Sequence, residues 1–161
     1  MTFKRPKEKM PDKALKAWRL NGFFKALIEG IFVGAYWIVN ARFFQWPSWI
    51  GTVLTVLFLV VALLHILIIP KIRMIYWGYQ INEQDIDIQY GIIVVKRILV
   101  PMQRIQHVDT EHGPILRLFG LATLIISTAG TNHKIPALEE KTAEQLRRQI
   151  STLAQASEED V

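Results

Sequence analysis

The sequence predicts an α+β membrane protein in which a two-helix transmembrane hairpin is followed by an antiparallel β-sheet domain with a C-terminal α-helix. Three observations predict this class. A nearly continuous apolar stretch fills much of the first 70 residues, the residues after it alternate with a period of two, and the last segment has an apolar repeat of helical spacing. At 161 residues the chain has room for one small domain beyond the hairpin.

Residues 50–69 are the stronger of the two predicted membrane spans. They carry no formal charge when His65 is neutral, and as a helix they would be about 30 Å long, which is one hydrocarbon thickness. A span is favoured over a buried core helix because so short a chain could not surround this segment on all sides. Pro70 follows directly, and Lys71 and Arg73 come next, at the expected interface.

Residues 26–40 predict a weaker first span. Glu29 would be costly at mid-bilayer, but near one end it can reach the headgroups and pair with Lys25 at the i, i+4 spacing. The short connection to the second span predicts a hairpin of antiparallel helices. The alternative of a cleaved signal peptide is less favoured, because a second span follows at once and no clear cleavage site is present. An aromatic belt is expected in the connection from Phe43, Phe44, Trp46 and Trp49.

The net charge of +5 is unevenly distributed along the chain. Residues 1–25 hold eight Lys or Arg against two acidic residues, a balance of +6, whereas residues 71–161 hold ten against eleven, a balance of −1. A near-neutral domain is not typical of nucleic-acid binding, so we expect no nucleic acid partner. The positive-inside rule places both termini of the expected two-span membrane protein in the cytoplasm.

The region after the hairpin predicts short antiparallel strands and then a helix. Residues 85–89 alternate apolar and polar side chains, as in a strand with one buried face. Near the end, Ala143, Leu146, Ile150 and Leu153 recur at helical spacing. The expected strands cover residues 74–82, 84–91, 92–100, 103–110, 121–129 and 132–136, with a short turn or helical turn at 113–120. The expected parts of the chain are a basic cytoplasmic arm (1–22), the hairpin (23–70), the cytoplasmic domain (71–155) and a flexible tail (156–161).

Residues 104–130 carry a family resemblance. The order and spacing of "RIQHV", "GPILRLFGLA" and "STAG", with a two-span hairpin before them and a helix after them, resemble the YdbS-like family of bacterial membrane proteins with a pleckstrin-homology-like (PH-like) domain. The resemblance implies a PH-like antiparallel barrel or sheet capped by the C-terminal helix. It also implies a bacterial cell membrane protein that works beside a larger relative carrying several such domains.

Several kinds of chemistry have no support in the sequence. The chain has no cysteine, which excludes disulfides, thiolate metal sites and a cysteine nucleophile. It also lacks the nucleophile elbow, the Walker A loop and the dinucleotide-binding glycine pattern. A Ser127–Lys134 pair has no fixed geometry, and His65 is more often a polar anchor than a proton relay. We therefore expect no enzyme activity, no metal and no cofactor.

A metal-dependent site is kept as a minor alternative. His107, Asp109 and Glu111 would share one face of a strand, and these side chains bind metals. Against this reading, no zinc-binding spacing is present, and polar residues that approach a Gly-Pro turn are commonly solvated or cap backbone groups.

Two binding surfaces are expected on the domain. Lys96, Arg97 and Arg104 are candidate contacts for anionic lipid headgroups, in an alternative reading of the protein as a lipid-sensing module. Arg117 and Phe119, in the glycine-bounded segment 113–120, are candidate docking residues for another PH-like domain. The principal expectation is a membrane-anchored scaffold that contacts membrane lipids and assembles with another integral membrane protein.

Overall fold

The computed structural model describes residues 8–44, 46–91 and 94–159. The chain divides into two compact units. One is Trp18–Lys71, and the other contains the described residues of Met1–Ala17 together with Ile72–Val161. The first unit is all helical and the second holds the β-strands, which confirms the predicted α+β membrane class. Residues 8–17, expected in a separate basic arm, thus belong to the same compact unit as the strands.

Two long continuous helices supply the hairpin. The first consists of α1 (Asp12–Val39) and the π-helical turn η1 (Asn40–Phe44). The second consists of α2 (Ser48–Leu63), the π-helical turn η2 (Leu64–Ile68) and α3 (Ile69–Tyr76). Both are long and apolar enough to cross a bilayer. Each extends beyond the predicted span, because helical structure continues into the polar residues outside the apolar stretch.

Small residues let the two helices of the hairpin approach closely. A Cβ added to Gly22 would overlap the backbone carbonyl oxygen of His65, and one added to Gly51 would lie 2.6 Å from the Trp37 ring. The Trp37 indole donates a hydrogen bond of 3.0 Å to Thr55 Oγ1, which itself donates to the Gly51 carbonyl at 2.8 Å. Close packing of this kind is the main attraction between helices in lipid, where no hydrophobic effect acts between them.

Two polar groups inside the hairpin have close partners within it. Asn40, although 7% exposed, accepts a hydrogen bond of 2.8 Å from the Trp46 backbone amide and donates one of 3.3 Å to its carbonyl. The Glu29 carboxylate lies 3.6 Å from His65 Nδ1 on the other helix, instead of making the expected pair with Lys25. The sequence does not predict the contact between Glu29 and His65, because it depends on which residues of the two helices lie opposite each other.

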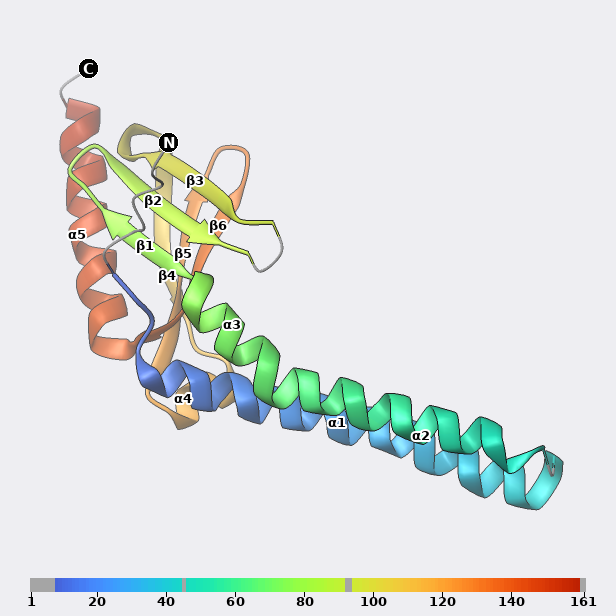
Figure 1. Cartoon of the computed structure of the whole chain (residues 1–161). Helices are drawn as coiled ribbons and strands as arrows, with labels where there is room; N and C mark the ends of the chain where they lie inside the picture. The colour runs from blue at the N-terminus through green and yellow to red at the C-terminus, as the bar shows by residue number, and fades with distance from the viewer. Residues whose placement is uncertain (1–7, 45, 92–93, 160–161) are drawn as a thin grey trace. The chain divides into compact units, whose positions relative to one another are not determined.

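The C-terminal unit contains two antiparallel sheets (Figure 1). In each sheet the strands are ordered as in the sequence, and the middle strands β2 and β5 pair on both sides. The 3₁₀ turn η3 (Met102–Arg104) and the short helix α4 (Pro114–Leu118) lie between strands. The first sheet holds β1 (Gly78–Ile81), β2 (Asp85–Tyr90) and β3 (Lys96–Pro101), and the second holds β4 (Ile105–Glu111), β5 (Leu121–Thr128) and β6 (Asn132–Glu139).

The predicted amphipathic helix α5 (Glu140–Glu159) completes the core of this unit. Ala143 and Ile150 are fully buried, and the helix packs against η3 and the second sheet. On its outer face, two guanidinium groups hydrogen-bond to Glu144 and lower the pKa of this carboxyl to about 2. The helix includes residues 156–159 of the predicted tail, while 160–161 lie outside the described residues. The fully buried large side chains of the unit are Ile86, Ile88, Met102, Leu121, Leu124, Ile126, Ile135, Leu138 and Ile150.

A closed barrel, implied by the family resemblance, does not form. The strands make two separate three-stranded sheets, and no ladder joins them among the described residues. The reason lies at the end of β3. Pro101 has no amide hydrogen, so it cannot donate a further hydrogen bond between strands. The turn η3 then separates β3 from β4, which belongs to the second sheet. The two sheets therefore keep a cleft between them.

The bounds of several predicted strands also differ from the structure: residues 103–104 lie in η3, and the last strand continues from the expected 132–136 to Glu139. Residues 74–76 are helical, because α3 continues through them and β1 begins only at Gly78. The strand expected at 92–100 begins at Lys96, and Val94 and Val95 before it are exposed. Ile92 and Ile93 lie outside the described residues. Val94 and Val95 are apolar but not buried, because they lie before the first residue of β3 that pairs with β2.

The contact at Gly22 gives a direct test of the helix packing. We expect Gly22→Ala to lower the stability of the detergent-solubilised protein by about 1–3 kcal/mol, because the added methyl group meets backbone that cannot rotate away. Gly34→Ala is the matched control on the same helix, since a Cβ there meets nothing within 4 Å. Alanine has the higher helix propensity, so Gly34→Ala should be neutral or stabilising. Equal thermal unfolding temperatures for the two variants would contradict the close packing.

Candidate functional site

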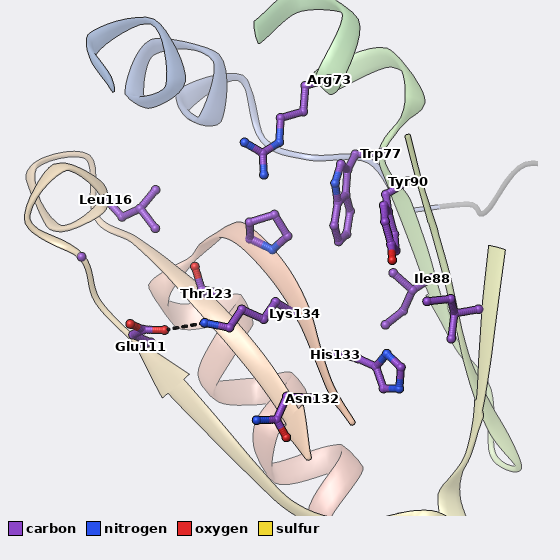
Figure 2. A pocket seen from close by; sticks show the side chains of 13 residues that line it. Arg73, Trp77, Ile88, Tyr90, Glu111, Leu116, Thr123, Asn132, His133 and Lys134 are labelled. Carbon is purple, nitrogen blue, oxygen red and sulfur yellow. Dashed lines mark hydrogen bonds and ion pairs between the residues drawn. The ribbon is translucent and has the colours of Figure 1, made fainter. Parts of the chain in front are cut away.

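The C-terminal unit has a cleft of about 490 Å³ between its two sheets. This volume lies in the range typical of small-molecule sites. Figure 2 shows side chains from both sheets and from α3 directed into it. The lining residues are Arg73, Trp77, Ile88, Tyr90, Ile98, Glu111, Gly113, Leu116, Thr123, Asn132, His133, Lys134 and Pro136.

One wall of the cleft is aromatic and apolar. The rings of Trp77 and Tyr90 stack with centroids 5.8 Å apart and an interplanar angle of 21°. Tyr90 is placed by the two-residue period of β2, which puts it on the same face as the buried Ile88. Trp77 follows α3 directly and is 9% exposed. The stacked pair gives this wall a fixed shape with little rotamer freedom to lose on binding.

The opposite wall is polar and carries charge. Lys134 Nζ on β6 lies 3.2 Å from Glu111 Oε2 on β4, and both side chains are more than half exposed. They meet across β5, whose Thr123 is the register partner of Glu111 and whose Ile125 is the partner of Lys134. Asn132 and His133 line the same side, and the His133 Nε2 atom hydrogen-bonds with the Thr131 hydroxyl at 3.0 Å.

The third part of the cleft comes from Arg73 on α3. Its guanidinium group is directed toward the cavity from above the Trp77 ring (Figure 2). Arg73 and Lys134 therefore bring two cations to one cavity, against the single carboxylate of Glu111 among the thirteen lining residues. The cleft combines an apolar aromatic surface with a net positive charge.

The sequence-predicted cations do not converge at a single site. Lys96 begins β3 and Arg104 ends η3, so the six-residue strand β3, about 17–20 Å long, separates them. Arg97 is already engaged by Asp87 on the adjacent strand β2. None of these three residues lines the cleft between the sheets.

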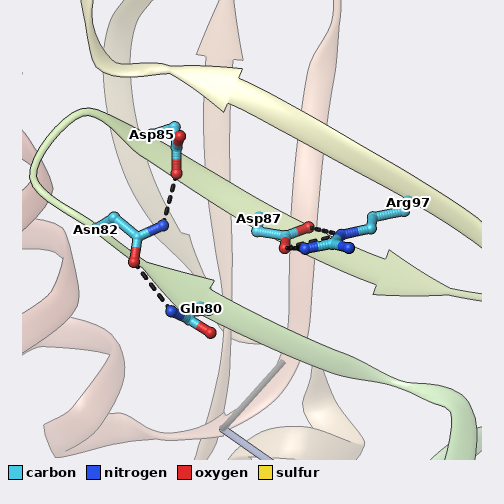
Figure 3. A network of polar contacts seen from close by, with 5 residues as sticks. All are labelled: Gln80, Asn82, Asp85, Asp87 and Arg97. Atoms are coloured by element: carbon cyan, nitrogen blue, oxygen red, sulfur yellow. Dashed lines mark hydrogen bonds and ion pairs between the residues drawn. The ribbon is translucent and has the colours of Figure 1, made fainter. Parts of the chain in front are cut away.

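The Asp87–Arg97 pair is part of a polar network on the outer face of the first sheet (Figure 3). Arg97 Nε donates hydrogen bonds of 2.9 Å to both Asp87 oxygens, and its Nη2 donates to Oδ2. These hydrogen bonds and the carboxylate charge raise the pKa of the Arg97 guanidinium. Asp87 is only 5% exposed, so Arg97 neutralises a buried carboxylate. Because Arg97 compensates this buried charge, the contact favours a structural role for Arg97 over lipid binding.

The candidate metal residues lie along β4 but are divided between two ion pairs. His107 Nε2 is 3.8 Å from Asp109 Oδ2, with both side chains more than 60% exposed, whereas Glu111 pairs with Lys134. Among the described residues, no three His, Cys, Asp or Glu side chains are grouped so that they could hold a metal ion. His112 follows β4 and is exposed.

The glycine-bounded segment folds as the predicted helical turn. Pro114 takes the first position of α4, and Gly120 after it has φ +63°, a conformation that favours glycine. Arg117 is exposed and Phe119 is half-buried. Leu118 between them is 75% exposed, the highest value for a large apolar side chain in the described part of the C-terminal unit.

The sequence does not predict that most of the residues lining the cleft belong to one site. The sequence indicates Arg73 only as an interfacial cation and Lys134 only as a possible partner of Ser127. The alternation of β2 indicates that Tyr90 shares a face with Ile88, but no local pattern places that face opposite β6. The sequence indicates Arg117 and Phe119 as docking residues and does not indicate Leu118, because the exposure of Leu118 depends on which face of α4 packs on the sheet.

Comparison with known proteins supports this architecture. Residues 25–154 match a protein family described as "Bacterial PH domain". The chain is 44% identical over 156 residues to the UPF0699 transmembrane protein YdbS of Bacillus subtilis (strain 168), and the match covers 97% of this chain and 98% of that relative. No solved structure matches the chain.

The Asp87–Arg97 pair predicts an asymmetric effect of mutation. Arg97→Ala should lower the unfolding temperature more than Asp87→Ala, because it leaves a buried carboxylate without its cation. Asp87→Ala leaves only a guanidinium that is 41% exposed and can be hydrated. Thermal unfolding of the two variants measures the difference. Equal effects, or a larger effect of Asp87→Ala, would contradict a structural role for Arg97.

Proposed function

This chain belongs to the bacterial PH domain family, and we propose that it is a non-enzymatic scaffold that assembles with another integral membrane protein. The two helices anchor a PH-like module beside the bilayer. The proposed partner is a larger relative of the same family that carries several such domains. The family and the description of the relative as a transmembrane protein favour an anchored binding module over an enzyme.

The exposure of Leu118 is the observation that carries this proposal. A leucine side chain that is 75% exposed gains about 1.5–3 kcal/mol when a partner buries it. It lies next to the exposed Arg117, and arginine beside an apolar anchor is a frequent composition of protein interfaces. Phe119 is half-buried, whereas α4 presents Leu118 and Arg117 as exposed side chains at its C-terminal end.

Two other readings receive less support from the geometry. Lipid sensing through Lys96, Arg97 and Arg104 would need these cations to converge, whereas β3 separates two of them and Asp87 engages the third. A metal-dependent enzyme at His107, Asp109 and Glu111 would need one shared site, whereas these side chains belong to two separate ion pairs. Both remain predictions from the sequence.

A substitution at Leu118 tests the proposed assembly. After gentle detergent extraction, the wild-type chain should retain a specific membrane protein partner, and Leu118→Glu should reduce its recovery by about tenfold, the equivalent of 1.4 kcal/mol. Leu99→Glu is the matched control, because Leu99 is also exposed (58%) but lies on β3. Recovery of the chain alone, under conditions that keep other membrane complexes intact, would contradict the proposal.

The proposed orientation has both termini in the cytoplasm. The basic residues before the first apolar stretch, together with Lys71 and Arg73 after the second span, support it, because only Arg42 lies in the connection between the spans. Reporter fusions to each terminus should both give cytoplasmic signals. An external signal from the C-terminal fusion would overturn this topology.

A further inference from the structure

The strand β3 forms one edge of the first sheet (Figure 1). β2 pairs with one side of β3 along all six of its residues. Among the described residues, no strand or isolated bridge pairs with the other side. The edge of a sheet presents backbone amides and carbonyls that can pair with another chain. The first sheet can therefore be extended at β3 by a strand from another molecule.

The hydrogen-bond pattern of the sheet determines which backbone groups of β3 face this edge. Just beyond β3, the Met102 amide donates to the Gln84 carbonyl at 3.0 Å. Hydrogen-bonded and non-hydrogen-bonded pairs alternate along an antiparallel ladder, so the backbone groups of Ile98 point toward β2. The amides and carbonyls of Arg97 and Leu99 point the other way, toward the open edge.

The other edge of the same sheet is paired with a segment of the chain itself. On β1, Tyr79 exchanges two backbone hydrogen bonds with Glu8, of 3.2 and 3.3 Å, in an antiparallel bridge. Met10, close to this bridge, is buried. The sheet thus accepts an added antiparallel segment at β1, whereas the described part of the chain offers no such segment to β3.

The middle of β3 lacks the features that keep an edge strand from pairing. Natural edges are commonly protected by charged side chains or by proline. Lys96 and Pro101 are such residues, but they lie at the two ends of β3. In the middle of the strand, the charge of Arg97 is neutralised by Asp87, and Leu99 is an exposed apolar side chain. Pairing at this edge therefore brings no uncompensated charge against the added strand.

We propose that β3 pairs in antiparallel orientation with β3 of a second copy of this chain. The two-fold axis passes beside Ile98, which faces Ile98 of the second copy in a non-hydrogen-bonded pair. Leu99 then lies opposite Arg97 of the second copy, and the outward amides and carbonyls of these residues meet. The two first sheets become one continuous sheet.

The residues of β3 favour this register over its two neighbours. In one neighbouring register, Arg97 would lie opposite Arg97 of the second copy, and like charges directly opposite each other are destabilising. In the other, Arg97 would lie opposite Pro101, which has no amide hydrogen to donate. A strand that fits its own copy in this way identifies a second copy of the chain as the occupant of the edge.

Cysteine crosslinking tests the register directly, because the chain has no cysteine of its own. The Cα atoms of a non-hydrogen-bonded pair lie about 4.5 Å apart, within the range of a disulfide. In membranes that contain the full-length protein, oxidation with copper phenanthroline should therefore link Ile98→Cys into a dimer. The mass of the linked species identifies the second copy, and a link to a different protein would overturn the proposal.

Leu99→Cys is the matched control on the same strand. Leu99 is more exposed than the half-buried Ile98, so random collisions would favour Leu99→Cys. In the proposed register, however, the two copies of residue 99 are diagonal neighbours about 7–8 Å apart, too far for an unstrained disulfide. Ile98→Cys should therefore crosslink several-fold more. No dimer from Ile98→Cys, or an equal or larger yield from Leu99→Cys, would overturn the pairing.

Leu99→Pro, made in the Ile98→Cys background, tests the backbone pairing. It removes an amide that faces the open edge and leaves the hydrogen bonds to β2 in place, so the crosslink should fall several-fold while the sheet is kept. Leu99→Thr keeps the amide and should retain most of the crosslink. A folded Leu99→Pro variant with an undiminished crosslink would contradict the proposal. Where circular dichroism shows that Leu99→Pro is unfolded, the comparison of the two cysteine positions decides.

The pairing at β3 does not rest on the proposed assembly at Leu118, and the two can be separated. Leu118→Glu in the Ile98→Cys background should leave the crosslink as it is. Leu99→Pro should leave recovery of the larger membrane partner as in the wild type. Loss of the crosslink in a folded Leu118→Glu variant would show that the dimer forms through α4 and would overturn the pairing at β3.

Discussion

The absence of water from the hydrocarbon layer is the constraint on which the rest of this structure depends. Backbone amides and carbonyls there must be paired within the segment, so the two apolar stretches can only be helices. Helical geometry then fixes where along the chain the hydrocarbon ends. Here α3 continues as a helix past Ile69 to Tyr76, and the first strand begins two residues after α3 ends.

The same constraint shapes the inside of the hairpin. Lipid tails are as apolar as leucine, so the helices gain little from burying their apolar side chains against each other. Contact is made instead where Gly22 and Gly51 let the opposing helix approach, and where polar side chains find partners. Glu29 and His65 lie 3.6 Å apart, and Asn40 ties the connection to the backbone of Trp46.

In the C-terminal unit, the incomplete closure of the sheets is what makes a binding site possible. A fully hydrogen-bonded small barrel would fill its interior with side chains. Here the chain leaves the first sheet at Pro101 through η3, and the core is completed by α5 on the second sheet. The space that remains between the sheets is lined by residues from both of them and from α3.

Local sequence patterns are enough to predict the class of the protein, the two helices, the amphipathic face of α5 and the helical turn at 114–118. The family expected from residues 104–130 is confirmed. These features were predictable because apolar length, the two periodicities and the glycine and proline positions are local properties of the chain. Other features are seen only in the folded structure. Arg97 neutralises Asp87, and Glu29 lies close to His65. Arg73, Tyr90 and Lys134 line one cleft. Each of these depends on how elements distant in sequence pack together, and no local pattern encodes that distance.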